Sequence, residues 1–279
     1  MQPLFEHRLE LAGYRTRALE LEGEGPPLLL LHGWADSADT WRLLLDRLAR
    51  EGRAALALDL PGFGAAGKLT GAPILEQLDA FVDAALEQTG QETVVVGNSL
   101  GGCAALRAAE RHDLGGVLAV APAGLDMARW FVLVRRDPLV RTLLSSPLPV
   151  PNAITRRVVA GVYSRLVFHR PSEVDPLVAR AFAGHLESRA TAARVVRTAR
   201  RLLPELDDCF EFDQIDCPVL LVWGRQDVLV FQSGAERVLD AVPGSRLEVI
   251  DNCGHCPQLE RPDRLGDLLL DFLGSPASL

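Results

Sequence analysis

The chain has 279 residues, of which 48% are apolar, and it carries a formal net charge of −8 at pH 7. A chain of this length can bury a large core, as one large domain or as a domain with an insertion. The negative charge and the spread of the arginines along the chain argue against a general affinity for nucleic acid. No stretch approaches the ~18 apolar residues of a membrane-spanning helix, and the N-terminus lacks the features of a signal peptide. We therefore expect a cytoplasmic protein without a membrane span.

The five cysteines favour reduced thiols over a disulfide framework, because their number is odd and the chain is of middle size. Cys253 and Cys256 have the spacing of a redox or metal pair, but no second pair stands at metal-ligand spacing. We interpret them as two small side chains beside His255 and expect no metal site.

The N-terminal residues predict a β-hairpin. Residues 5–20 alternate loosely between apolar and polar side chains around Gly13, which favours two antiparallel strands at a sheet edge. Residues 23–27 contain two glycines and two prolines and are predicted to form a turn.

Beyond the hairpin, short apolar strands alternate with amphipathic helices. We expect strands at residues 28–31, 54–58, 94–96, 116–120, 217–223 and 246–250. We expect helices at residues 41–50, 74–89, 103–111, 234–241 and 262–273. This alternation predicts a mostly parallel sheet with right-handed crossovers.

The alternation stops after Gly124. Residues 125–206 contain arginine-rich helical segments that are broken by seven prolines. We interpret this stretch as a helical cap that is inserted into a core formed by residues 1–124 and 207–279.

The pattern Gly97-x-Ser99-x-Gly101 lies between a predicted strand and a predicted helix. A serine on so sharp a turn has a strained backbone, and a Cβ at either glycine would collide with the neighbouring strand or helix. The N–H of Leu100 would then point from the positive end of the helix toward an oxyanion. The pattern predicts a nucleophile elbow with Ser99 as the nucleophile.

A serine hydroxyl becomes a good nucleophile only when a base takes its proton and an acid orients that base. Among the six histidines, His255 lies in a loop directly after a predicted core strand near the C-terminus. Asp227 also follows a strand, and the order Ser, acid, His is that of a hydrolase triad. Asp251 and Asp126 remain alternatives for the acid.

The segment His32-Gly33-Trp34 follows the strand at residues 28–31. Gly33 would allow this loop to approach the elbow closely, and the N–H of Trp34 would be a second oxyanion donor beside Leu100. The alternative is a tight turn in which Trp34 is a hydrophobic plug. Both interpretations can hold, because the proposed donor belongs to the backbone.

Five motifs in this order resemble the α/β-hydrolase fold family, from about Pro26 to Gly274. The motifs are His32-Gly33-Trp34, Asp59-Leu60-Pro61-Gly62-Phe63-Gly64, Gly97-Asn98-Ser99-Leu100-Gly101-Gly102, Trp223-Gly224-Arg225-Gln226-Asp227, and Gly254-His255 with Glu260-Arg261-Pro262. The resemblance implies an α/β fold with an eight-stranded, mostly parallel sheet, helices on both faces and an inserted helical cap. It also implies a Ser99, Asp227 and His255 triad beneath that cap and no cofactor.

The residues give a less definite indication of the subfamily. Ser99 stands where the similar haloalkane dehalogenases and epoxide hydrolases carry an aspartate, which argues against those chemistries. Asn98 resembles the C–C bond hydrolases of aromatic-ring degradation, whereas Cys256 stands where those enzymes often carry a tryptophan. The cap arginines could bind a carboxylate or form a solvated helix face; they include Arg135, Arg136, Arg189 and Arg194.

We therefore expect a serine hydrolase that cleaves a small to medium, largely apolar carboxylic ester or thioester through an acyl-enzyme on Ser99. One alternative is a C–C bond hydrolase of a meta-cleavage type diketone. The other is a ligand-binding module that keeps this fold and has little turnover. The sequence leaves the oligomeric state open.

Overall fold

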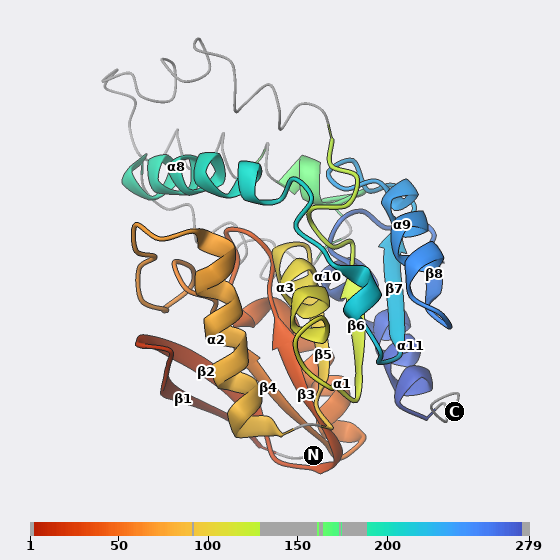
Figure 1. The fold of residues 1–279 in the computed structure, drawn as a ribbon. Coiled ribbons are helices and arrows are strands. Elements are labelled where there is room, and N and C mark those ends of the chain that lie inside the picture. Colours follow the sequence, from red (N-terminus) through yellow and green to blue (C-terminus); the bar gives the residue numbers. More distant parts are fainter. Residues whose placement is uncertain are drawn as a thin grey trace.

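The computed structural model describes residues 3–90, 92–128, 161, 164–172, 174 and 189–274 (Figure 1). The strands are β1 (Leu4–Leu11), β2 (Tyr14–Leu21), β3 (Glu24–Leu31), β4 (Arg53–Leu58), β5 (Val94–Asn98), β6 (Gly116–Val120), β7 (Val219–Gly224) and β8 (Arg246–Ile250). The α-helices are α1 (Arg42–Arg50), α2 (Ile74–Thr89), α3 (Leu100–Ala109), α8 (Arg189–Glu205), α9 (Ala235–Ala241), α10 (Pro257–Glu260) and α11 (Pro262–Gly274). The 3-10 helices within the described residues are η1 (Ala38–Trp41), η2 (Phe212–Gln214) and η3 (Gln232–Gly234).

The described strands form one eight-stranded sheet in the order β1-β2-β4-β3-β5-β6-β7-β8. The strands β1 and β2 pair antiparallel with Leu11 opposite Tyr14, and this confirms the predicted hairpin at the sheet edge. The pair β2 and β4 is also antiparallel, and all later pairs are parallel. The mostly parallel sheet is therefore confirmed.

The prediction of a turn over residues 23–27 is wrong, because β3 already begins at Glu24. The N–H of Glu24 donates to the Gly52 carbonyl at 2.8 Å, which attaches the start of β3 to the turn before β4. The register then shifts between Glu24 and Leu28. Pro26 and Pro27 lie in this irregular stretch, where prolines without an N–H interrupt pairing but do not end the strand.

Apolar side chains on both faces of the sheet are buried under helices. On β3, Leu29 and Leu31 belong to the core on one face, and Leu28 and Leu30 belong to the core on the other. Residues of α2 and α3 cover the first face, and residues of α1 and α11 cover the second. Because helices cover β3 on both faces, its side chains must be apolar on both faces, which explains the continuous apolar run.

The helix α8 lies over the end of the sheet where the parallel strands finish, above α2 and α3 in Figure 1. Leu202 and Leu206 in and after this helix belong to the main core, and Glu205 accepts the N–H of Leu75 at 2.8 Å. A helix in the predicted cap is thus present and attached to the start of α2. Most of the predicted cap lies outside the described residues. No helix in the described ranges is long and apolar enough to cross a membrane.

The turn between β5 and α3 brings backbone atoms into close contact. Ser99 has φ +54° and ψ −111°, a strained conformation for a residue with a side chain. A Cβ at Gly97 would lie 2.1 Å from the Gly101 carbonyl oxygen, and one at Gly101 would lie 2.1 Å from the Leu31 carbonyl oxygen. The predicted steric need for both glycines is therefore confirmed.

Replacing Gly101 with alanine should destabilise the protein by about 3 kcal/mol or more, because the added methyl group meets a backbone carbonyl that cannot rotate away. Urea unfolding would measure the loss. Gly71→Ala is the matched control, since a Cβ there meets nothing within 4 Å and should change the free energy of unfolding by less than about 0.5 kcal/mol. Equal effects from the two substitutions would contradict the steric argument.

Candidate active site

The elbow residue Ser99 is held by hydrogen bonds on both sides of the turn. Its N–H donates to the Val120 carbonyl at 2.8 Å, and its own carbonyl accepts N–H bonds from Cys103 at 2.9 Å and Ala123 at 3.0 Å. Ser99 itself is 9% exposed. These bonds link the strained residue to β6 and α3, so the surrounding structure fixes where the side chain begins.

His255 and Asp227 form a buried pair at the ends of β7 and β8. The Nδ1 atom of His255 lies 2.7 Å from Oδ2 of Asp227. The other oxygen of Asp227 accepts the N–H groups of Leu229 at 2.8 Å and Val230 at 3.1 Å, so the carboxylate cannot rotate freely. A carboxylate on Nδ1 favours a proton there, which leaves Nε2 of the neutral imidazole as the basic nitrogen.

The two alternative carboxyls lie in other surroundings. Asp251 is exposed and forms an ion pair with Arg225. Asp126 accepts the hydroxyl of Ser233 at 2.5 Å. Of the three carboxyls considered, Asp227 is the one bonded to His255.

Ser99 and His255 line the same cavity, which has a volume of about 120 Å³. Most of its other lining side chains are apolar: Trp34, Leu100, Ala123, Met127, Leu166, Val167, Ala199, Leu202, Leu203, Leu206, Leu229, Val230 and Cys256. Three of these residues, Ala199, Leu202 and Leu203, come from α8. The polar lining side chains in the described part of the chain are Asp36, Asn98, Ser99 and His255.

The described lining of the cavity includes no arginine. Arg194 on α8 is exposed, as the interpretation of a solvated helix face predicts. The predicted candidates Arg135 and Arg136 lie outside the described residues. The side chain of Arg189 also lies outside the described part.

The loop after β3 approaches the elbow through Gly33. A Cβ at Gly33 would lie 3.3 Å from Cβ of Ser99 and 3.2 Å from Oδ1 of Asn98. Trp34 and Leu100 both line the cavity beside Ser99. Leu100 is the first residue of α3, where backbone N–H groups have no acceptor within the helix. The half-buried Trp34 ring also packs against Phe63, with the ring centroids 4.9 Å apart.

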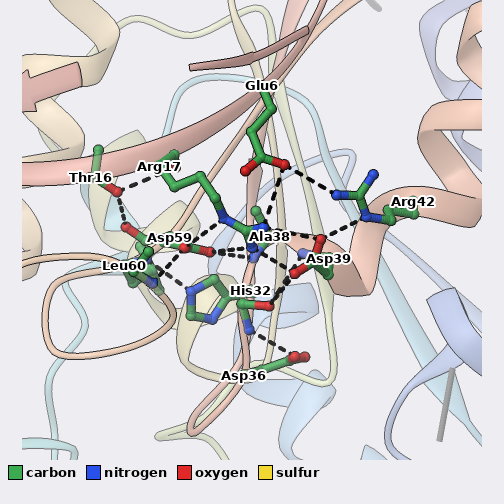
Figure 2. Close-up of polar contacts among 12 residues, drawn as sticks. Glu6, Thr16, Arg17, His32, Asp36, Ala38, Asp39, Arg42, Asp59 and Leu60 are labelled. Atoms are coloured by element: carbon green, nitrogen blue, oxygen red, sulfur yellow. Dashed lines mark hydrogen bonds and ion pairs between the residues drawn. The ribbon is translucent and has the colours of Figure 1, made fainter. Parts of the chain in front are cut away.

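A buried polar network holds this loop against the loop after β4 (Figure 2). His32 accepts the N–H of Leu60 on Nε2 at 2.8 Å, and its Nδ1 lies 2.7 Å from the Gly33 carbonyl. The Asp59 side chain is fully buried and accepts the N–H groups of Ala38 and Ala65, each at 2.7 Å. The side chains of His32 and Asp59 therefore hold both loops. Both residues belong to the sequence motifs, but the sequence alone did not indicate this role.

Arg17 from β2 supplies the positive charge of this network. Its side chain contacts Asp59 at 3.0 Å and Asp39 at 2.7 Å. Burial disfavours the charged guanidinium, but the hydrogen bonds that it donates to Asp39 and Asp59 raise the pKa of Arg17 above its ordinary value. Burial likewise opposes ionisation of Asp39, but Arg17 and Arg42 lower the pKa of that carboxyl.

Asp36 lies two residues after Trp34, and no arginine or lysine in the described part of the chain forms an ion pair with it. It is 3% exposed, and burial raises its pKa to about 8, against the smaller effects of the Ser37 N–H and the Thr40 hydroxyl. Oδ1 accepts the Ser37 N–H at 2.8 Å, whereas Oδ2 has no hydrogen-bond partner within the described structure. No sequence pattern distinguished Asp36 from an ordinary loop aspartate, because its environment is formed only by tertiary contacts.

Asn98 and Gln258 connect the elbow to the histidine loop. The Asn98 amide donates to the His255 carbonyl at 3.0 Å. Gln258 is fully buried and donates to Oδ1 of Asn98 at 3.0 Å and to the Thr40 hydroxyl at 3.3 Å. These contacts join the segments that carry Ser99, His255 and Trp34, and Gln258 gave no sequence signal.

Glu260 joins the histidine loop to a described segment of the predicted cap. Its carboxylate accepts the N–H groups of Gly254 and His169, each at 2.8 Å. The N–H of His255 in turn donates to the Val167 carbonyl at 2.8 Å. Burial raises the pKa of Glu260 above its ordinary value, although these N–H groups act in the opposite direction.

Cys253 and Cys256 are free, buried thiols on either side of His255. Burial raises the pKa of Cys256 well above its ordinary value, and its Sγ lies 3.6 Å from Oδ1 of Asn98. Within the described residues no group of three or more His, Cys, Asp or Glu side chains could hold a metal ion. Both thiols belong to the buried cores on the two faces of the sheet.

Comparisons with known proteins identify a family. Residues 28–268 match the model of the Alpha/beta hydrolase family. A pimeloyl-[acyl-carrier protein] methyl ester esterase from Nitrosomonas europaea is 26% identical, over 88% of this chain and 95% of that protein. The monoacylglycerol lipase ABHD6 from Bos taurus is 25% identical, over 91% of this chain and 77% of that protein. An esterase from Exiguobacterium antarcticum has the same fold, with a TM-score of 0.79 at 16% identity over 97% of this chain and 100% of that one.

Replacing Asp36 with asparagine should stabilise the protein increasingly as the pH rises. The carboxyl binds its proton more tightly in the folded state, so the wild-type protein loses stability from about pH 4, the unfolded pKa, up to about pH 8. The difference in unfolding free energy between the variant and the wild type should grow by about 1.4 kcal/mol per pH unit in this window. Urea unfolding at several pH values measures it, and parallel pH curves would contradict the assignment.

Proposed function

Because this chain belongs to the alpha/beta hydrolase family and is a hydrolase of the carboxylesterase and lipase type, we propose that it cleaves a small to medium, largely apolar carboxylic ester or thioester through an acyl-enzyme on Ser99. The observation that carries this proposal is the placement of Ser99 and His255 in the wall of one apolar cavity, with Asp227 bonded to His255. The residues come from three distant parts of the chain.

The proposed reaction begins when Nε2 of His255 takes the proton of the Ser99 hydroxyl. The serine oxygen attacks the substrate carbonyl, and the N–H groups of Trp34 and Leu100 stabilise the oxyanion. His255 then protonates the leaving alcohol or thiol as the bond to the acyl carbon breaks. Water, activated by the same imidazole, cleaves the acyl-enzyme and restores the free hydroxyl. Asp227 holds the proton on Nδ1 throughout.

The lining of the cavity supports an apolar acyl group. Leucine, valine, alanine and methionine side chains surround Ser99, and those from α8 close the cavity from the side of the predicted cap. An apolar group that enters such a cavity leaves water, which favours binding. A buried arginine would favour the C–C bond hydrolase, and the described lining contains none. The ester and thioester proposal is therefore preferred.

Replacing Ser99 with alanine should lower the hydrolysis of p-nitrophenyl acetate by a factor of about 10³ or more, because the acyl-enzyme can no longer form. The wild-type protein should react with a fluorophosphonate probe at Ser99, and the variant should not. Circular dichroism would check that the variant is folded. A folded wild-type protein without labelling or turnover would favour the ligand-binding alternative.

Replacing Asp227 with asparagine should lower kcat by about 10⁴, because the imidazole loses the carboxylate that fixes its tautomer. Asp251→Asn is the matched control, since this exposed carboxyl also follows a core strand but pairs with Arg225. Its kcat should remain within about twofold of the wild type, as expected for a surface ion pair. A large loss of kcat in Asp251→Asn with none in Asp227→Asn would reverse the assignment of the acid.

A further inference from the structure

Two cysteine thiols lie close together near the turn that carries Ser99. Cys103 belongs to α3, and Cys209 lies in the segment between α8 and η2. Their Sγ atoms are 3.9 Å apart, although the two residues are 106 positions apart in the chain. Both are free thiols in this structure. The fold therefore brings two thiols from distant parts of the chain within reach of each other.

The surroundings of this thiol pair connect it to the nucleophile turn. The N–H of Cys103 donates to the Ser99 carbonyl at 2.9 Å. The N–H of Ala123 donates to the same carbonyl at 3.0 Å, and a Cβ at the next residue, Gly124, would lie 3.0 Å from Sγ of Cys209. The thiol pair thus lies between α3 and the segment after β6, and both of these hold Ser99.

Arg107 on α3 holds the segment that contains Cys209. Its Nη1 donates to the Cys209 carbonyl, and its Nη2 forms an ion pair with Asp79 at 2.5 Å. The N–H of Glu211 donates to the Glu110 carboxylate at 2.8 Å. Because these bonds fix the backbone at Cys209 and just after it, the two thiols are kept next to each other.

The two thiols differ in burial and in acidity. Cys209 is half-buried, whereas the other four cysteines of the chain are buried. The hydrogen bond from Cys103 and the charge of Arg107 lower the pKa of Cys209, against the effect of burial. The hydrogen bond with Cys209 and burial raise the pKa of Cys103 well above its ordinary value. Cys209 is therefore the thiol that ionises first and reacts first with a small oxidant.

We propose that Cys103 and Cys209 form a redox site, at which oxidation by a peroxide closes a disulfide between α3 and the segment that follows α8. The Cys209 thiolate attacks one oxygen of hydrogen peroxide, the O–O bond breaks, and the sulfur becomes a sulfenic acid as hydroxide leaves. The Cys103 sulfur then attacks the Cys209 sulfur, and the S–O bond breaks. The oxygen leaves as water with the proton of Cys103. The two thiols lose two electrons, and the peroxide is reduced to two molecules of water.

The disulfide attaches one wall of the cavity to the nucleophile helix. Leu202 and Leu203 of α8, and Leu206 just after it, line the cavity that contains Ser99. Cys209 follows three residues after Leu206. A bond from Cys209 to α3 therefore restricts the end of α8 relative to Ser99. This inference does not depend on the ester hydrolysis proposed above.

Counting the thiols of the peroxide-treated, folded protein tests the inference. After treatment and subsequent unfolding in guanidinium chloride, the wild type should have lost two of its five thiols, and dithiothreitol should restore them. Mass spectrometry of the digested protein should show Cys103 bonded to Cys209. A wild type that keeps all its thiols under conditions that oxidise free glutathione, or a disulfide between other cysteines, would overturn the inference.

Three substitutions assign the bond and the order of the two steps. Cys209→Ser removes the thiol that reacts first, so this variant should keep its remaining thiols. Cys103→Ala removes the partner, so Cys209 should remain a sulfenic acid that dimedone labels. Cys217→Ser is the matched control at another buried cysteine and should form the disulfide as the wild type does. Equal thiol loss in Cys209→Ser and the wild type, or no dimedone label in Cys103→Ala, would contradict the assignment.

Thermal unfolding tests whether the bond attaches the segment without distorting the fold. A disulfide restricts the unfolded chain, and closing so long a loop should raise the unfolding midpoint by about 5 °C or more. Circular dichroism compares the peroxide-treated wild type with the same protein after dithiothreitol. The same treatment of Cys103→Ala should give no rise. A disulfide-bonded wild type with an unchanged or lower midpoint would overturn the proposed attachment.

Discussion

The close packing of α3 against β5 and β3 is the constraint on which the site depends. The backbone atoms of Gly97, Gly101 and Leu31 approach so closely that no Cβ fits between them. This contact places Ser99 on a turn with a positive φ, held by bonds to Val120 and Ala123. Contacts with the surrounding sheet and helix offset the unfavourable free energy of the strained backbone at Ser99, as is common at functional sites. The result is a hydroxyl at the carboxyl edge of the sheet, next to the first turn of a helix.

The other parts of the site are loops at the same edge, and buried polar groups fix their positions. Asp59 binds backbone N–H groups of both loops that follow β3 and β4, and Arg17 neutralises its charge. Removing one partner of such a buried pair is costly, because the other charge is left uncompensated. Asn98, Gln258 and Thr40 make a second connection from the elbow to the histidine loop. The geometry around Ser99 is thus held by hydrogen bonds from outside the proposed triad.

The cavity combines an apolar lining with a small number of polar side chains. Asp227 is bonded to His255 and to two backbone N–H groups, whereas burial raises the pKa of Asp36 above its ordinary value. Two aspartates near one cavity therefore stand in different surroundings. Glu260 connects the histidine loop to the segment at Val167 and His169, so the described part of the predicted cap is attached to the same framework.

The sequence by itself determined the alternation of strands and helices, the edge hairpin and the elbow, because these depend on local periodicity and on glycines at fixed spacing. The chain order of Ser99, Asp227 and His255 also indicated the proposed triad. Only the tertiary structure separated Asp227 from Asp251 and Asp126, since all three occupy similar local sequence contexts. It also decided the start of β3 at Glu24, the contacts of Gln258 and the raised pKa of buried Asp36. These features depend on contacts between residues far apart in the chain and on burial, which no local pattern of residues encodes.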